Sequence, residues 1–391
     1  ADLDALGRQR LSNRVGAGLD PCGAIQAFLM VPAGQERQVV FILGAARSEH
    51  EMREVLHRYG GIDGARVALE TVWDFWKRLL GGVYVETPDP AVNLLTNHWL
   101  LYQAVASRFW GRSGFYQSGG AYGFRDQLQD AMALLHERAD LVRDHILRCA
   151  GRQFHDGDVQ HWWHPPTGRG VRTRFSDDYL WLPYVTARYV AATGDTGILN
   201  EHTNFLEGRP VEPGEESYYD LPQVSEDSAS LYEHCLRAVR RSLHFGDHGM
   251  PFIGCGDWND GLNRVGKDGR GESVWLAFFL YDVLTHFADL ARRQNDHAAV
   301  EQCEQAARTI QANLDKHGWD GRWYRRAYFD DGKVLGSASS PECRIDALPQ
   351  SWSVLSGAGP EERAEMAMQS VLEHLVDWNL GVIRLFTPPF D

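Results

Sequence analysis

The sequence predicts a mainly α-helical protein in which paired helices close into a toroid, an all-α barrel with a site at one end. Two observations predict this fold. From about residue 88 onward, helical patterns of apolar residues follow one another almost without interruption. The connections between them, at 111–124, 151–176, 204–226 and 245–271, are long and carry the polar motifs. A plain helical bundle is the alternative, but bundles have short connections.

The elements divide into three parts in chain order. Residues 1–46 hold two β-type runs, 24–31 and 38–44, separated by the turn residues of 32–34, and we interpret them as the remnant of a β-sandwich. Residues 47–87 have helical spacing and form a predicted linker. Residues 88–391 form the predicted catalytic barrel, cut short at its C-terminus. Its first helix is expected over 93–110, and later helices near 126–135, 139–150, 177–193, 228–244, 272–294, 297–316, 344–356 and 360–376.

Composition limits the class of protein. The chain has 391 residues, 43% of them hydrophobic, and a formal net charge of −14, which disfavours nucleic acid or an anionic membrane as the main partner. The six cysteines are scattered without metal-ligand spacing, so reduced thiols are expected. No apolar run approaches the roughly 18 residues of a membrane span, and no signal peptide is recognisable. The chain begins at Ala1 rather than methionine, and we expect a piece of a longer polypeptide.

The chain is organised around the polar loop 254–263, Gly-Cys-Gly-Asp-Trp-Asn-Asp-Gly-Leu-Asn. Its glycines allow tight turns and close approach of a ligand. An indole stacks on the C–H face of a sugar, and an apolar neighbour helps a carboxylic acid to keep its proton at neutral pH. These residue types therefore indicate carbohydrate chemistry. The alternative is a loop in which Asp257 and Asn259 only form Asx turns and caps.

A second polar cluster opens the helix near 126. Arg125, Asp126 and Gln127 combine a guanidinium, a carboxylate and an amide, a set suited to binding sugar hydroxyls. Asp126 and Asp130 share one helix face, so helix capping with an internal ion pair is the alternative. No strand precedes the glycines before Arg125, and the spacing is not that of a nucleotide-binding loop.

A third cluster spans 158–181. Arg169, Arg172 and Arg174 form a positive patch suited to an anion such as phosphate. His161 and His164 raise the question of a metal, but the Pro-Pro that follows breaks any helix and no third ligand stands nearby, so no metal is expected. Glu233 and His234, in a later helix, either reach the site or only pack in the core.

These clusters resemble glycoside hydrolase family 94, the inverting disaccharide and oligosaccharide phosphorylases. The resemblance rests on Gly-Asp-Trp-Asn-Asp-Gly, on Gly-Phe-Arg-Asp-Gln-Leu-Gln-Asp and on Arg-Thr-Arg-Phe-Ser-Asp-Asp-Tyr-Leu-Trp-Leu-Pro. The wording is closest to the phosphorylase-like C-terminal domains of cyclic β-1,2-glucan synthases. The resemblance implies a β-sandwich, a helical linker and an (α/α)6 toroid barrel, of which this chain holds a sandwich remnant and fewer than twelve helices.

The resemblance also implies the roles of several residues. Asp260 falls at the position of the general acid. Trp258, Asp178 and Arg172 fall at positions that hold the sugar in the donor subsite. From their residue types, further candidates for binding substrate are Arg125, Asp126, Gln127, Asp257 and Glu233. Candidates for binding phosphate are Arg169, Arg174 and His161, with the rest of that site expected beyond Asp391.

The implied reaction is phosphorolysis of a β-1,2-glucan with inversion, giving α-glucose 1-phosphate and needing phosphate as co-substrate but no cofactor. One reading places the chain within a synthase whose chain length it controls, alongside glycosyltransferase and cyclisation domains of the same parent chain on the cytoplasmic side of the bacterial inner membrane. Alternatives are a stand-alone phosphorylase of β-1,2-oligoglucosides or cellobiose, a catalytically silent glucan-binding module, and an inverting hydrolase.

Overall fold

The computed structural model describes residues 7–14, 16–18, 23–112, 119–212 and 214–390. Contacts divide the chain into two units, 1–78 and 79–391, and each is described by itself. Part of the loop predicted at 111–124 lies outside the described residues, because 113–118 are not among them. The proposed division at 46 and 87 stays a prediction.

The first unit is extended chain followed by helix. The sequence predicts that 24–31 and 38–44 are two strands of a sheet. The described backbone is extended in both runs, but no ladder of hydrogen bonds joins them, so this prediction is wrong. Only the turn between them forms, with the Gln35 amide donating to the Pro32 carbonyl. Their apolar side chains, such as Phe28 and Leu43, are exposed. A two-stranded hairpin is marginal in water without a surface to pack on, and the described part of this unit offers none.

Two helices complete this unit and lead into the next. Helix α1 covers Glu49–Tyr59 and is capped by Ser48, whose hydroxyl accepts from the Glu51 amide. Helix α2 covers Gly61–Leu80. It carries the apolar residues expected on one side, yet among its described residues only Leu79 is fully buried, while Trp73 is largely exposed.

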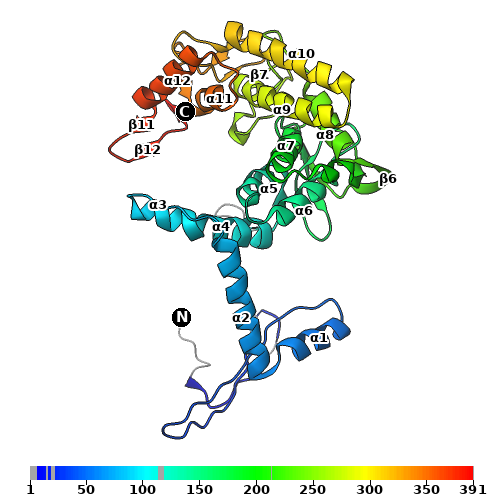
Figure 1. Cartoon of the computed structure of the whole chain (residues 1–391), viewed down its shortest axis with the longest axis vertical. Helices are drawn as coiled ribbons and strands as arrows, with labels where there is room; N and C mark the ends of the chain where they lie inside the picture. Colours follow the sequence, from blue (N-terminus) through cyan, green and yellow to red (C-terminus); the bar gives the residue numbers. More distant parts are fainter. Residues whose placement is uncertain (1–6, 15, 19–22, 113–118, 213, 391) are drawn as a thin grey trace. The chain divides into compact units, whose positions relative to one another are not determined.

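The second unit is built from helix pairs in two layers. In one layer α5, α7, α9 and α11 each contact the next, and in the other lie α6, α8, α10 and α12. Figure 1 shows the pairs following one another around an arc. All eight helices expected between 126 and 376 are confirmed, with ends that differ by a few residues. Their bounds are Phe124–Ala131 (α5), Ala139–Ala150 (α6), Trp181–Thr193 (α7), Leu231–Ser242 (α8), Val274–Arg293 (α9), His297–Asn313 (α10), Ala347–Leu355 (α11) and Glu361–His374 (α12).

A further helical rod precedes α5. It is continuous but irregular, because α-helical and π-helical turns alternate along it: Pro90–Leu94 (α3), Leu95–Trp99 (η2), Leu100–Gln103 (α4) and Ala104–Gly111 (η3). Its last segment contacts α5. The alternation of layers is that of a toroid barrel, and the described residues supply the rod and four pairs, fewer than the twelve helices of a closed (α/α)6 ring.

Helix α9 is the core of this unit. Its aromatic residues stack with those of neighbouring helices: the Phe279 ring lies 4.6 Å from Trp181 of α7 and 5.1 Å from Trp352 of α11. Within the described part of the chain, α9 is the one helix whose length and mean hydropathy would suit a membrane span, and 78% of its most apolar stretch is buried inside the protein. The five described cysteines are free and buried, and Cys22 is outside the described residues.

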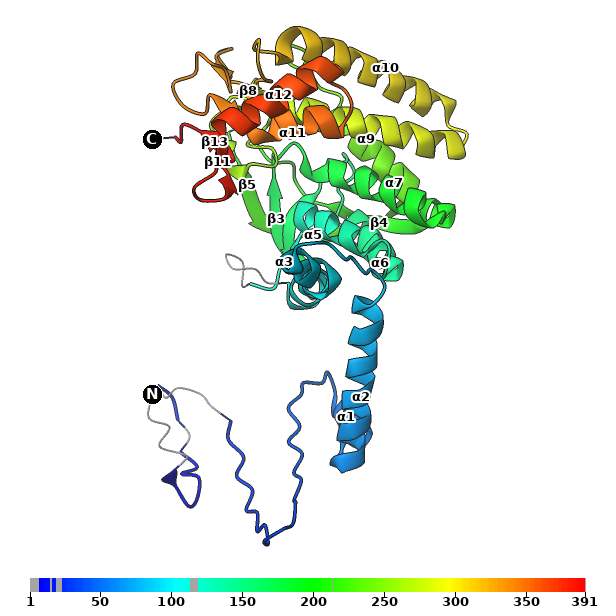
Figure 2. The same ribbon diagram turned by 60° about the vertical axis from the view of Figure 1, so that its left-hand side comes forward.

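Short antiparallel strands lie in the connections and at the starts of some helices, and the sequence predicts none of them. The largest sheet has the order β1-β2-β3-β5, and Figure 2 shows β3 and β5 side by side. Smaller sheets pair β4 with β6, β10 with β13 and β11 with β12, and join β7, β8 and β9. The strand bounds are Tyr122–Gly123 (β1), Gln160–His164 (β2), Arg169–Thr173 (β3), His202–Glu207 (β4), Ser217–Asp220 (β5), Gln223–Ser230 (β6), Glu272–Ser273 (β7), Ala327–Tyr328 (β8), Val334–Leu335 (β9), Ile345–Asp346 (β10), Val376–Asp377 (β11), Val382–Ile383 (β12) and Phe386–Thr387 (β13).

Short helical turns complete the secondary structure. They are Met132–Leu134 (η4), Asp178–Leu180 (η5), Thr196–Asn200 (η6), Asp260–Leu262 (η7) and Leu314–Gly318 (η8). Two of them, η5 and η7, begin at candidate site residues, Asp178 and Asp260. The polar segments singled out in the sequence therefore form defined turns, and η5 leads directly into α7.

Candidate functional site

The polar loop 254–263 packs against the segment 174–178. The Cys255 amide donates to the Arg174 carbonyl at 3.2 Å, and the Ser176 amide donates to the Gly256 carbonyl at 3.1 Å. Gly254 has a φ of +64°, and a Cβ there would lie 1.9 Å from the Arg174 carbonyl oxygen. Only glycine fits this position, because a side chain would collide with the backbone it pairs with. The loop and the paired aspartates at 177 and 178 are thereby brought together.

Asp257 anchors this loop in the interior. Its carboxylate accepts two hydrogen bonds from Arg326, at 2.6 and 2.7 Å, and one from the Ser273 hydroxyl at 2.7 Å. Arg326 also donates to Asp346, the N-cap of α11, at 3.1 Å. Burial raises the pKa of Asp257, but Arg326 outweighs it and leaves that pKa below its usual value. The fully buried side chain of Asp257 is taken up by these partners, and a role in binding substrate stays a prediction.

Arg125, on α5, joins the loop to the paired aspartates. Its guanidinium donates to Asp260 at 2.9 Å and to Asp177 at 3.1 Å, and lies 3.3 Å from Asp178. It also donates to the carbonyls of Asp257 and Trp258, both at 3.2 Å. The arginine is almost completely buried. One cation therefore holds three carboxylates and the backbone of the loop in a single cluster.

The buried members of this cluster titrate unusually. Burial raises the pKa of Asp177 to about 7. Burial also raises the pKa of Asp178, but His161 and Arg125 outweigh it, so that the pKa lies below its usual value. His161 is 2.8 Å from Asp178 through Nδ1. Perturbed groups beside a cavity are typical of functional sites, although structural networks perturb pKa values too.

Asp260 and Trp258 form the outward tip of the loop. The Asp260 side chain is 55% exposed although Arg125 holds one of its oxygens. The Trp258 residue is 36% exposed, and its indole donates to the Gln129 side chain at 3.2 Å. The Asn259 amide donates to Asp257, and the Asn259 side chain accepts from the Gly261 amide. Asx turns thus shape the loop, and the same turns present an acid and an indole face to solvent.

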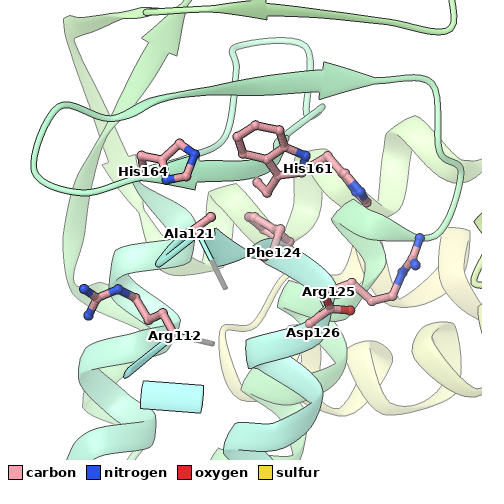
Figure 3. A pocket seen from close by; sticks show the side chains of 10 residues that line it. Arg112, Ala121, Phe124, Arg125, Asp126, His161 and His164 are labelled. Carbon is pink, nitrogen blue, oxygen red and sulfur yellow. The ribbon is translucent and has the colours of Figure 1, made fainter. Parts of the chain in front are cut away.

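A cavity of about 390 Å³ adjoins this cluster. Figure 3 shows its labelled side chains, with His161 and His164 on β2 facing Arg112, Phe124, Arg125 and Asp126 across the space. Its volume falls within the roughly 300–1,000 Å³ of small-ligand pockets. Arg125 both lines the cavity and binds Asp260, so one guanidinium connects the candidate acid to this space, although Asp260 is not itself among the lining residues.

Neighbours on α5 have mixed roles. Asp126 lines the cavity and lies 3.8 Å from Arg108, which also binds Asp130. The two carboxylates of α5 thus pair with an arginine of the preceding rod rather than within the helix. Gln127 is buried and closes the turn before α5 by accepting from the Gly123 amide. A role for Gln127 in binding substrate stays a prediction.

Arg172 and Glu233 are not brought to this cluster. Arg172 is buried, and its guanidinium donates to Asp158 at 2.8 Å, to Asp156 at 2.7 Å and to the Arg209 carbonyl. Glu233 pairs with Arg237 at 2.8 Å on α8, one helical turn away. Both side chains are occupied by local partners in this arrangement, and a role for either one in binding sugar stays a prediction.

The three candidates for binding phosphate are dispersed. His161 belongs to the Arg125 cluster. Arg169 is exposed at the start of β3, with its guanidinium 5.8 Å from the Tyr219 ring. Arg174 lines a different cavity. Arg169, Arg172 and Arg174 thus face different neighbours rather than one shared patch, and phosphate binding by any of the candidates stays a prediction.

The sequence does not identify Arg326 or Gln129 as parts of the site. Arg326 is 69 residues from Asp257, within a run of arginines and aromatic residues that carries no local motif. Asp346 stands in the segment Cys-Arg-Ile-Asp as a minor signal. No group of three or more potential metal-ligating side chains occurs among the residues that the structure describes.

We expect the His161–Asp178 pair to make stability depend on pH. Burial lowers the pKa of His161, but the charge and hydrogen bond of Asp178 outweigh it and raise that pKa. The stabilisation is then complete below about pH 6.5, the usual histidine value, and is lost as pH rises through the raised pKa. The free energy of unfolding of wild type minus that of His161→Gln should shrink above pH 7, by at most about 1.4 kcal/mol per pH unit.

The control is His164→Gln, because His164 lines the same cavity and has no carboxylate partner among the residues that the structure describes. Urea unfolding of the three proteins at pH 6, 7, 8 and 9 provides the measurement. A difference for His161→Gln that grows with pH would show that the pair is not charged in the folded protein.

The chain matches known proteins along almost its whole length. The family described as "Glycosyl hydrolase 94 superfamily, catalytic domain" matches residues 75–391, and its supersandwich domain matches residues 2–62. The cyclic beta-(1,2)-glucan synthase NdvB of Rhizobium meliloti (strain 1021) is 47% identical over 373 residues, which are 95% of this chain and 13% of that protein. Solabiose phosphorylase of Paenibacillus borealis is 31% identical over 402 residues, 100% of this chain and 47% of that protein.

A solved structure is also similar. Cellobiose 2-epimerase from Spirochaeta thermophila DSM 6192 matches with a TM-score of 0.49 and 12% identity, covering 80% of this chain and 76% of that one. The chain thus spans about half the length of the curated phosphorylase it matches, and a much smaller share of the synthase.

Proposed function

Because this chain belongs to the glycosyl hydrolase 94 superfamily, we propose that it is part of a phosphorylase-like domain that cleaves a β-1,2-glucan with phosphate. The reaction inverts the anomeric carbon and releases α-glucose 1-phosphate. Asp260 carries the proposal, because it is a carboxyl group open to solvent and held by Arg125, a residue that lines a sugar-sized cavity. The 47% identity to a cyclic β-1,2-glucan synthase supports the choice of substrate.

In the proposed reaction Asp260 is the general acid. It gives its proton to the glycosidic oxygen while the bond from that oxygen to the anomeric carbon breaks. Phosphate attacks the anomeric carbon from the opposite face, so the configuration inverts. Arg125 then stabilises the carboxylate that remains, since its guanidinium lies 2.9 Å from Asp260. The half-exposed indole of Trp258 offers an apolar face on which the sugar can stack.

The surroundings of Asp260 favour phosphate over water as the nucleophile. An inverting hydrolase needs a second carboxylate to activate water, about 6.5–9.5 Å from the acid. The other carboxylates of this cluster, Asp177 and Asp178, are buried and bound to Arg125 and His161. They are poor candidates for a base that must bind a water molecule. Phosphate is already an anion and needs no such base.

The proposal extends to the parent protein. As part of a synthase, the domain would shorten glucan chains before cyclisation, next to glycosyltransferase and cyclisation domains of the same chain. It would then lie on the cytoplasmic side of the inner membrane, without inserting into it. The 31% identity to solabiose phosphorylase favours a second candidate, a stand-alone β-glucoside phosphorylase.

The test is an assay of glucose 1-phosphate from linear β-1,2-glucan, with and without inorganic phosphate. It uses this chain and a complete domain extended beyond Asp391. We expect phosphate-dependent product from the complete domain, and cellobiose and solabiose as substrates distinguish the second candidate. Free glucose released without phosphate would instead indicate a hydrolase. Glucan binding without product from either protein would indicate a binding module, and would overturn the proposal.

A further inference from the structure

A second cavity lies behind the polar loop. It has a volume of about 280 Å³ and is bounded by the segment 174–179, the end of α8 and the loop that follows α8. This is slightly below the roughly 300–1,000 Å³ of pockets that take drug-sized ligands. The space therefore suits a small ion or a single small group rather than an oligosaccharide.

Arg174 faces this cavity without a partner of its own. No hydrogen bond or ion pair of its guanidinium occurs among the described residues, and its Nε is shielded from solvent with no acceptor. Its backbone is fixed from both sides, since its amide donates to Glu216 and its carbonyl accepts from Cys255. A buried donor that lacks an acceptor is destabilising, and a charged donor more so. An acceptor supplied by a ligand would remove this cost.

The other groups around the cavity leave an excess of positive charge. Arg241 lies 3.3 Å from Asp158, and both line the cavity, so their charges balance. Asp158 is shared with Arg172, at 2.8 Å. His244 also lines the space, and Arg174 adds a charge that none of these groups neutralises. The wall as a whole favours an anion, in a protein whose net charge is −14.

Neutral hydrogen-bond donors complete the wall. Tyr179 lines the cavity, and burial raises the pKa of its hydroxyl, which therefore remains a donor at neutral pH. The Arg241 guanidinium lies 5.7 Å from the Tyr179 ring. Guanidinium and hydroxyl donors around a small space are the groups that bind the oxygens of phosphate or sulfate.

This cavity is separate from the Asp260 cluster. The Phe175 ring stands between them, since it lines this cavity while Arg125 of the cluster lies 5.6 Å from the same ring. His161 packs on that ring as well, at 4.8 Å. Gly254 of the polar loop lines the cavity, so a ligand here would touch the loop from the side away from Asp260.

We propose that this cavity binds a small tetrahedral oxyanion, with Arg174 as its principal ligand. The site is distinct from the one at which a co-substrate would attack a sugar, and it does not depend on the proposed function. The shared ligand chemistry is the phosphate group, either free or carried by a sugar. The bound anion would brace residues 174–176 and the loop paired with them.

The experiment is a calorimetric titration of the whole chain with inorganic phosphate at constant ionic strength. We expect Arg174→Gln to weaken phosphate binding at least tenfold. Arg169→Gln is the matched control, because it removes the same charge from β3 at an exposed position, and it should change binding less than twofold. Arg174→Lys keeps the charge but loses the planar guanidinium group. Its affinity for phosphate should lie between that of wild type and that of Arg174→Gln.

Further arms identify the source of the phosphate group. Sulfate should compete with phosphate, and glucose should not. Glucose 1-phosphate competes only if the cavity admits the sugar as well. Circular dichroism checks that each variant is folded, and if Arg174→Gln is not, Tyr179→Phe should still weaken phosphate binding severalfold. Equal loss in Arg174→Gln and Arg169→Gln, or no phosphate binding by wild type, would overturn the inference. The titration measures phosphate binding and not phosphorolysis. A failure to detect phosphorolysis in the separate assay would therefore contradict the proposed function and not this inference.

Discussion

Replacing Arg326 with methionine is expected to lower the free energy of unfolding of the second unit by about 3–5 kcal/mol. The arginine is completely buried between Asp257 and Asp346, and it donates to both carboxylates. Methionine fills similar space but leaves two buried carboxylates without a counter-charge. Breaking a buried ion pair from one side is costly because the remaining charge has lost its solvation and its partner. Urea unfolding followed by circular dichroism gives the value.

The matched control is Arg322→Met, four residues earlier. Arg322 also pairs with a carboxylate, Glu373, at 2.7 Å, but the two side chains are 58% and 40% exposed. Exposed pairs contribute about 0–1 kcal/mol. A loss below 1 kcal/mol for Arg326→Met would show that water reaches Asp257 and Asp346 or that both are neutral in the fold.

Replacing Asp260 with asparagine is expected to lower the rate of phosphorolysis by the complete domain about 10²–10⁴-fold, the usual contribution of a general acid. Asparagine keeps the shape of the side chain and an oxygen that Arg125 can bind, but it has no proton to give to the leaving oxygen. Glucan binding should change little, since the Trp258 indole and the cavity remain. Initial rates of glucose 1-phosphate formation measure the effect on kcat and KM separately.

Asp268→Asn is the control, because Asp268 is an exposed carboxylate eight residues further along the same connection. Its rate should equal that of wild type. A rate for Asp260→Asn within a few-fold of wild type would show that another group protonates the leaving oxygen. Folding is not expected to confuse this result, since the Asp260 side chain is more than half exposed.

The helices could be predicted from the sequence because each has its own apolar pattern. The pattern of α9, for instance, is complete within Val274–Arg293. The strands could not be predicted, since β2 and β3 are each five residues long and pair through residues such as Trp162 and Gly170 that have no alternating pattern. At 24–31 the error is the reverse, because the sequence predicts a strand where none pairs, and the cause is the same. Strand formation depends on partners, and an apolar run does not reveal whether a partner is present.

The candidate site was predictable in part. Motifs that follow one another in the chain identified Arg125, Asp178 and Asp260, and the structure brings these three together. It directs Arg172 to Asp156 and Asp158, because neighbouring carboxylates compete for the same guanidinium. Arg326 could not be found from the sequence, since its contact with Asp257 spans 69 residues and depends on the packing of three connections. Local spacing identifies residue types, and only tertiary structure assigns their partners.

The polar loop passes from the dry interior to open water within three residues. Asp257 is fully buried, whereas the side chain of Asp260 is 55% exposed. Within one short segment, Asp257 therefore stabilises the fold while Asp260 is available for the reaction. Substitutions at the tip can be selected for new reactivity with little loss of folding, while substitutions at the base are removed by unfolding before any activity is expressed. A library confined to Trp258 and Asp260 should consequently yield mostly folded variants, and one at Asp257 or Arg326 should not.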